Sequence, residues 1–282
     1  MSDTPTPDAR TVRIERIAEE GADAGIRILT LDRPERLNAM NRHLIDDLHL
    51  AIDDLRNDAD ARVAILTGAG RGFCAGLDLF DTPPNASSSS EGRGAVQRGM
   101  DLQQRIATLV PALRSLRIPV IAAVNGAAAG GGLALALAAD VRIAATSARF
   151  NVAFVRIGLS GCDIGVSWLL PRWIGASRAF ELMLTGRIVE SDEAFRIGLV
   201  TRVVPDDELL DSALETARLI SANSPTGVWM TKEVMWSQLE VGSLQAGIDL
   251  ENRTQIMTSF TEDMAEAATA FLAKRPPEFR NR

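Results

Sequence analysis

The longest apolar stretch of the chain, residues 118–141, constrains the fold most. It is long enough to raise the question of a membrane span, but small residues dominate it, and it contains Asn125 and four glycines. Such a segment gains little free energy on transfer to lipid, because few of its residues are Leu, Ile or Val. We therefore predict a buried strand, a tight turn and a buried helix, and no membrane association.

Strand and helix patterns alternate before this stretch. Residues 12–17 and 26–31 alternate apolar and polar side chains, as half-buried strands do. Residues 42–56 carry Leu and Ile at helical spacing, and residues 63–67 form a continuous apolar strand. Strands that alternate with helices in this way predict an α/β fold.

The same winding continues through the middle of the chain. A helix over 96–116 is followed by a strand at 119–124, a helix over 131–139 and a strand at 141–144. Beyond residue 151 we predict mostly helix, with one more short strand over 196–204.

Three regions follow from these patterns. Residues 1–10 are polar with two prolines and lack the basic start and apolar run of a signal peptide, so we predict a flexible tail. Residues 11–204 form the predicted α/β core. Residues 205–282 carry apolar helical stripes that must pack on the body or on a neighbouring subunit.

The residue inventory excludes several kinds of chemistry. The only histidines, His43 and His49, point to different faces of one predicted helix and cannot chelate a metal together. Two cysteines, Cys74 and Cys162, make neither a disulfide framework nor a thiolate metal site, which indicates a reducing, cytoplasmic setting. We expect no metal. An enzyme of this composition must use carboxylates, backbone amides or a bound cofactor.

The charge of the chain argues against nucleic acid as a partner. The formal net charge is −7, and the 30 basic residues form no basic block. An anionic ligand would therefore need a local basic pocket.

Two glycine-rich loops each follow a predicted buried strand. The first, residues 71–79, turns sharply at Gly72 and Gly76, and the second, residues 125–132, opens a helix. Both place backbone N–H groups at the carboxyl ends of parallel strands, where α/β proteins bind ligands. Two such loops together can direct two amides at one oxygen.

The second loop has two other interpretations, a dinucleotide-binding loop and a turn whose glycines serve helix packing alone. The spacing of Gly126, Gly130, Gly131 and Gly132 does not match the G-x-G-x-x-G pattern of dinucleotide-binding loops, and Asp140 is too close to serve as the ribose-binding acid. Close helix packing alone would also account for these glycines.

The run IPVIAAVNGAAAGGGLALALAADVRIA at residues 118–144 resembles the signature of the crotonase (enoyl-CoA hydratase/isomerase) superfamily. Four further segments fit the same family in the expected order: residues 31–40, 72–78, 184–204 and 271–275. The resemblance implies an α/β spiral of ββα turns with a C-terminal helical extension, and a homotrimer or a dimer of trimers. It also implies an acyl-CoA thioester substrate, with coenzyme A as part of that substrate and no other cofactor.

The resemblance further implies that the thioester oxygen lies between the N–H of Leu77 and the N–H of Gly131. Amides fixed in a dry site stabilise the enolate that forms there. The two catalytic glutamates of family hydratases correspond to Ala134 and Phe154 in this chain. Neither side chain can move a proton, so an ordinary hydratase mechanism is not expected.

Asp163 is the nearest replacement for these glutamates. In dienoyl-CoA isomerases an aspartate in a similar context moves a proton, and in chlorobenzoyl-CoA dehalogenases an aspartate near this position is the nucleophile. The alternative is that Asp163 caps a helix over residues 164–170, and one residue can do both.

Other residues are candidates for binding the substrate. Arg33 and Arg36 are candidates for the CoA phosphates, and Phe271 and Lys274 resemble a C-terminal pair that reaches the CoA of a neighbouring subunit. The remaining predicted binding residues are Gly76, Asp78, Leu79, Phe80, Gly130, Ala134 and Phe154.

Three functions stay open at this point. The first is double-bond isomerisation or hydration of an acyl-CoA with Asp163 as acid and base. The second is an acyl-CoA binder that has lost proton transfer. The third is a dehalogenase-like or hydrolytic relative with Asp163 as nucleophile.

Overall fold

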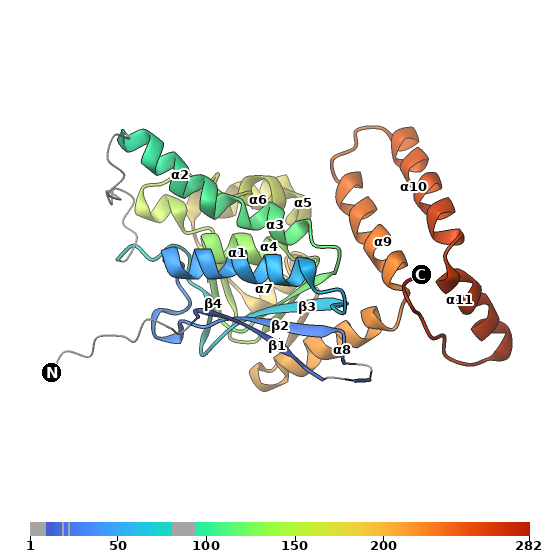
Figure 1. Ribbon diagram of the computed structural model, residues 1–282. Coiled ribbons are helices and arrows are strands. Elements are labelled where there is room, and N and C mark those ends of the chain that lie inside the picture. Colours follow the sequence, from blue (N-terminus) through green and yellow to red (C-terminus); the bar gives the residue numbers. More distant parts are fainter. Residues whose placement is uncertain (1–9, 19, 22, 81–93) are drawn as a thin grey trace.

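The computed structural model describes residues 10–18, 20–21, 23–80 and 94–282, so nearly all of the predicted tail lies outside the described residues. A six-stranded sheet forms the centre of the molecule, in the order β1-β2-β3-β5-β7-β10 (Figure 1). Strand β1 is antiparallel to β2, and the other neighbours are parallel. The strands are β1 (Val12–Arg16), β2 (Ile26–Leu31), β3 (Val63–Gly68), β5 (Val120–Val124), β7 (Val141–Ala145) and β10 (Arg202–Val204).

A second sheet of four short strands has the order β4-β6-β8-β9. Its strands are β4 (Gly72–Cys74), β6 (Ala127–Ala129), β8 (Arg149–Asn151) and β9 (Ile188–Glu190). Strands β4, β6 and β8 are parallel, and each directly follows a strand of the large sheet. A helix follows each of these strand pairs, which confirms the predicted ββα spiral.

Eleven α-helices occur in the described residues, seven of them after residue 165. They are α1 (Arg42–Asn57), α2 (Ala95–Ala107), α3 (Leu109–Arg114), α4 (Gly131–Ala138), α5 (Val166–Ile174), α6 (Ala176–Thr185), α7 (Ser191–Arg196), α8 (Leu209–Ser221), α9 (Pro225–Gln238), α10 (Leu244–Ser259) and α11 (Glu262–Ala273). Short 3-10 helices occur at Pro34–Arg36, Phe154–Ile157 and Asp206–Glu208. None of the helices in the described part of the chain is both long and apolar enough to cross a bilayer.

Helix α4 lies at the centre of the core. All eight of its residues are buried, so it is apolar on every side, as a helix enclosed by other elements must be. One core cluster contains α4 together with side chains of α1, α3 and α5. A second cluster joins the other face of the large sheet to α8.

Several predicted elements differ from the structure. Residues 26–31, predicted as a half-buried strand, are all buried, because β2 lies between β1 and β3 and its Arg27 pairs with Asp58. The helix predicted over 96–116 is divided into α2 and α3 at Thr108. Pro111 accounts for the division, because it has no N–H and its ring collides with the carbonyl of the residue four positions earlier, where α2 ends. The strand predicted over 196–204 is confined to β10, because α7 extends to Arg196 and Gly198 then turns the chain at a φ of +79°.

The C-terminal helices α9, α10 and α11 stand away from the sheets, whereas α8 packs on them (Figure 1). Lys232 and Trp236 attach α9 to the body. The Lys232 Nζ donates to the Ile118 carbonyl at 2.8 Å and lies 2.9 Å from the Asp140 carboxylate. The Trp236 Nε1 donates to the same carboxylate at 2.7 Å.

Candidate active site

The two glycine loops lie next to each other because the strands that precede them are neighbours. Strands β4 and β6 are parallel, with Cys74 opposite Ala128, so the chain leaves both strands at the same edge of the small sheet. Gly76 has a φ of +96°, and a Cβ added there would lie 2.8 Å from the Ala129 carbonyl and 3.5 Å from the Gly131 nitrogen. Only glycine permits this close contact between the loops.

Within the described residues, both loops contain backbone N–H groups without a backbone acceptor, and Leu77 and Gly131 are among them. On the first loop, the Met40 N–H donates to the Gly76 carbonyl at 2.7 Å, and the Asp78 N–H donates to the Met40 carbonyl at 2.9 Å. On the second loop, the Gly130 N–H donates to the Asn151 carbonyl at 2.9 Å. Within the described residues, the N–H groups of Leu77 and Gly131 have no hydrogen-bond acceptor.

The Gly131 N–H is the first of helix α4, so the helix dipole adds partial positive charge there. Unpaired backbone donors of this kind stabilise an anionic oxygen where they converge on it.

The surroundings of the loops are apolar. The Phe154 ring lies 3.4 Å from where a Cβ on Gly130 would be, and the Ile164 side chain lies 3.3 Å from the corresponding point on Gly131. The Met40 side chain contacts the same point on Gly131 even more closely. Ala134 is fully buried in α4. Positions 134 and 154 therefore carry no carboxylate.

Asp163 lies on the loop that leads into α5 and is half buried. Its Oδ1 accepts hydrogen bonds from the Gln103 side chain of α2 and, at 2.8 Å, from the Ile164 N–H. In the described part of the chain, no hydrogen bond reaches its Oδ2. Ile164 contacts the second loop, so Asp163 directly precedes a residue that lines the site. Its Oδ2 remains available to accept a hydrogen bond or a proton.

The interpretation of Asp163 as a helix cap is wrong. Helix α5 begins at Val166, two residues later than predicted, and its N-cap position is Gly165 with a φ of +89° and no side-chain cap. The chain turns too sharply at Ile164 (φ +36°) and Gly165 for a helix to start at residue 164.

The structure assigns Arg33 and Asp78 to a buried ion pair. The Arg33 Nη1 lies 3.1 Å from the Asp78 Oδ2, and the side chains are 10% and 3% exposed. This burial disfavours the predicted contact between Arg33 and a CoA phosphate. Arg36 is exposed, and its guanidinium lies 5.7 Å from the centre of the Phe80 ring. Phe80 and Leu79 are both exposed next to the first loop.

Phe271 and Lys274 do not reach the loops of the same chain. Both are exposed on or just after α11, which Figure 1 shows at the far end of the molecule from β4. Any contribution from them must be made to another copy of the chain.

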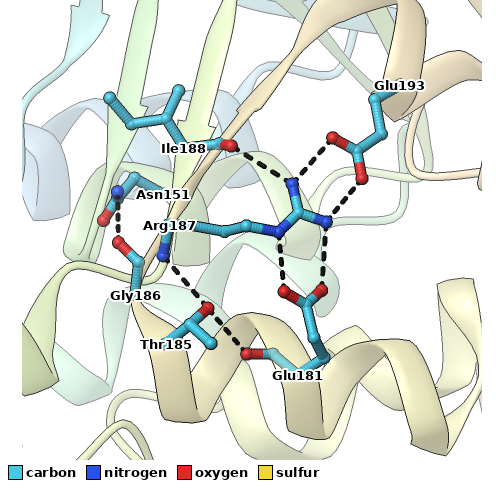
Figure 2. A network of polar contacts seen from close by, with 7 residues as sticks. All are labelled: Asn151, Glu181, Thr185, Gly186, Arg187, Ile188 and Glu193. Atoms are coloured by element: carbon cyan, nitrogen blue, oxygen red, sulfur yellow. Dashed lines mark hydrogen bonds and ion pairs between the residues drawn. The ribbon is translucent and has the colours of Figure 1, made fainter.

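A network of polar contacts connects Asn151, which is bonded to the second loop, with Gly186 and the ion pairs of Arg187 (Figure 2). The Asn151 side chain donates to the Gly186 carbonyl at 2.8 Å, while the Asn151 carbonyl holds the Gly130 N–H. Arg187 follows Gly186 and pairs with Glu181 at 2.7 Å and with Glu193 at 2.6 Å. The hydrogen bonds from Arg187 lower the pKa of Glu193.

Four of the residues that shape the site were missed by the sequence analysis as site residues. The only sequence evidence for Met40 as a site residue is its place in residues 31–40, one of the segments on which the family resemblance rests. Gln103, Asn151 and Ile164 gave none, because their contacts join segments that are far apart in the chain.

Comparisons with known proteins identify relatives of this chain. Residues 21–282 match the family model described as enoyl-CoA hydratase/isomerase. The chain is 44% identical over 254 residues to the probable enoyl-CoA hydratase EchA12 of Mycobacterium tuberculosis, covering 89% of this chain and 88% of that protein. It is 39% identical over 257 residues to 1,2-epoxyphenylacetyl-CoA isomerase of Escherichia coli, covering 91% and 95%.

The fold is also similar to that of solved structures. A probable enoyl-CoA hydratase/isomerase from Mycobacterium abscessus superposes with a TM-score of 0.87 at 38% identity, over 96% of this chain and 99% of that one.

Proposed function

Because this chain belongs to the enoyl-CoA hydratase/isomerase family, we propose that it acts on an acyl-CoA thioester and moves a double bond within the acyl chain. One observation carries the proposal: Leu77 and Gly131 hold unpaired N–H groups on two touching loops. The thioester oxygen would accept a hydrogen bond from both. One donor of this kind contributes about 3 kcal/mol to stabilising the transition state.

Asp163 is the proposed acid and base. For a 3-enoyl thioester, its carboxylate would take a proton from C2, and the electron pair would move onto the thioester oxygen to give a dienolate. The same carboxyl group would return the proton at C4, which leaves the double bond between C2 and C3. The unused Oδ2 of Asp163 supports this role, because one carboxylate that takes and returns one proton is sufficient for isomerisation.

Hydration is the less suitable reaction for this site. Water has to be held and deprotonated before it adds to a double bond, and family hydratases use two glutamates for this. Here those positions are Ala134 and Phe154, and Phe154 packs against the second loop. The names of the relatives include both hydratases and an isomerase, so similarity to them does not select one reaction. The choice between hydration and isomerisation therefore rests on the side chains of the site.

The rest of the substrate would lie along the surface that leads from the first loop. We propose Gly76, Leu79, Phe80 and Gly130 as contacts for the acyl and pantetheine parts. Phe271 and Lys274 would reach the CoA of a neighbouring subunit in a trimer or a dimer of trimers. Coenzyme A is part of the substrate, and we expect no further cofactor.

Binding without conversion is the second candidate function. The burial of Ala134 and the apolar wall of Phe154 favour it, because they remove the family's usual proton-transfer groups but keep the two amides. Such a protein would bind acyl-CoA and leave it unchanged.

Incubation in heavy water with saturated, 2-enoyl, 3-enoyl and dienoyl thioesters distinguishes these functions. Isomerisation is expected to give a chromatographically distinct product of the same formula, with deuterium incorporated only where the Asp163 carboxyl exchanges its proton with the solvent before returning it, whereas hydration would add the mass of one heavy water. The Asp163→Asn variant should lower turnover at least about 100-fold. Cys162→Ser, which changes the exposed neighbour, is the control and should retain activity. Unchanged turnover in Asp163→Asn would exclude its role in proton transfer, and tight binding with no product would support the second function.

A further inference from the structure

A buried ion pair lies directly behind the first loop. Counted over the whole residue, backbone included, Arg33 is 8% exposed and Asp78 is 4% exposed. Their charged groups are 3.1 Å apart. Asp78 is the residue that follows Leu77, whose N–H is one of the two proposed donors. We propose that this ion pair positions the Leu77 N–H; the inference rests on the proposed function.

The hydrogen bonds around Leu77 join it to the segment that contains Arg33. Met40 holds the chain on both sides of Leu77, through the Gly76 carbonyl and the Asp78 N–H. Arg33 contacts the chain on both sides of this bridge, because its Nη1 donates to the carbonyl of Ala39, which precedes Met40, at 2.6 Å and to the Asp78 carboxylate at 3.1 Å. The orientation of the Leu77 peptide therefore depends on the position of the Arg33–Asp78 ion pair.

Arg33 is itself fixed by the fold. The Asn38 side chain accepts a hydrogen bond from the Arg33 N–H at 2.8 Å, and the Asn38 N–H donates to the Arg33 carbonyl at 2.9 Å. The same Asn38 side chain donates to the carbonyls of Ala69 and Gly72, at 2.9 and 2.7 Å. These bonds tie Arg33 to the end of β3 and the start of β4.

The loop needs this support because it has little of its own. Leu77 lies outside the helices and strands and is connected to Met40 by an isolated bridge only, and Gly76 before it is in a conformation that favours glycine. A shift of about 1 Å in a catalytic group can cost about 100-fold in rate. The Arg33 charge has a second effect, since it neutralises a carboxylate that would otherwise oppose negative charge on the substrate oxygen.

The test measures how strongly the thioester carbonyl is polarised. A β-aryl enoyl-CoA is bound to the protein, and its carbonyl stretching frequency is measured by infrared difference spectroscopy. In the unaltered protein the frequency should fall below that of the free thioester. If it does not, the two-amide site and the proposed function fail, and the role of the ion pair fails with them.

Two variants then test the ion pair. Asp78→Asn keeps the shape of the side chain and removes the charge, and Arg33→Met removes the donors. Both should lose most of the frequency shift and lower kcat about 10- to 100-fold, while the Kd of the thioester changes less than about threefold. Arg33→Lys, which restores the charge, should recover part of both quantities and also serves if Arg33→Met does not fold.

A second buried ion pair provides the matched control. Lys232 and Asp140 lie 2.9 Å apart between α9 and the body, with side chains 5% and 17% exposed. Lys232→Met should lower the melting temperature but leave the carbonyl shift and kcat unchanged. A normal shift in the unaltered protein that persists in Asp78→Asn would overturn the proposal, as would an equal loss of shift in Lys232→Met.

Discussion

At the scale of single residues, the proposed site separates two kinds of contribution. Leu77 and Gly131 would act through backbone N–H groups, so the side chain at position 77 can vary without changing the donor. Asp163 would act through its carboxylate, so its role depends on an ionisable side chain. Gly76 is constrained in another way, since a Cβ would press on the Ala129 carbonyl.

The two cysteines should differ strongly in reactivity. Cys74 is fully buried in β4, and this burial raises the pKa of its thiol to about 12, whereas Cys162 is exposed. Because the thiolate is the reactive form, Cys74 in the folded protein should react with an aromatic disulfide reagent at least about 100-fold more slowly than Cys162. One thiol should be labelled before unfolding and two after it. Cys162→Ser should remove the fast reaction, and rapid labelling of both thiols in the native protein would contradict the burial of Cys74.

At the scale of elements, the end of the chain fastens the C-terminal helices to one another. Asp263, in the first turn of α11, accepts hydrogen bonds from the N–H of Arg280 at 2.7 Å and from the Ser224 hydroxyl at 3.0 Å. The Glu262 N–H donates to the Arg282 carbonyl at 2.7 Å. The final residues therefore connect the start of α11 to the start of α9.

We expect Asp263→Ala to loosen this connection. Asp263 is 2% exposed, so the change leaves several donors without a partner and should lower the local stability of α9 and α11 by about 1.5–3 kcal/mol. Hydrogen exchange resolved by segment would show faster exchange in residues 224–282 and little change in the sheets. Asp249→Ala, on the exposed face of α10, should change stability by less than about 0.5 kcal/mol. Equal protection in both variants would show that Asp263 does not hold the tail.

Elements of different length were predicted with different success. The strands β3, β5 and β7 and helix α4 agree with the predicted apolar runs, because four or more buried residues in a row give a clear signal. The strands of the small sheet have three residues each, which is too short for an alternating pattern to show. Strand β6 was included in a predicted turn for this reason.

At the scale of the whole molecule, the C-terminal helices expose apolar side chains that the body does not cover. Leu244 is 83% exposed, Phe260 86% and Leu272 82%. Soluble monomers rarely expose large apolar patches, so these helices are expected to contact another copy of the chain. This agrees with the trimer implied by the family resemblance and with the distance of Phe271 from the loops of its own chain.

Sedimentation equilibrium would test this expectation. The protein should sediment as a trimer or a hexamer, and Phe260→Asp should weaken association at least about 10-fold by placing a charge on the apolar surface. Leu50→Asp, at an exposed position of α1 on the body, should leave the mass unchanged. A monomer at micromolar concentration would remove the basis for a shared CoA site.

The sequence by itself determined the glycine loops, the buried strands before them, the family and the loss of the hydratase glutamates, because each of these is contained in a short run of residues. Tertiary structure alone decided that Asp163 does not cap a helix, that Arg33 pairs with Asp78, and that Met40 and Ile164 cover Gly131. These contacts join residues that are distant in the chain, and their geometry depends on how the sheets and helices pack. Local patterns carry no information about that packing.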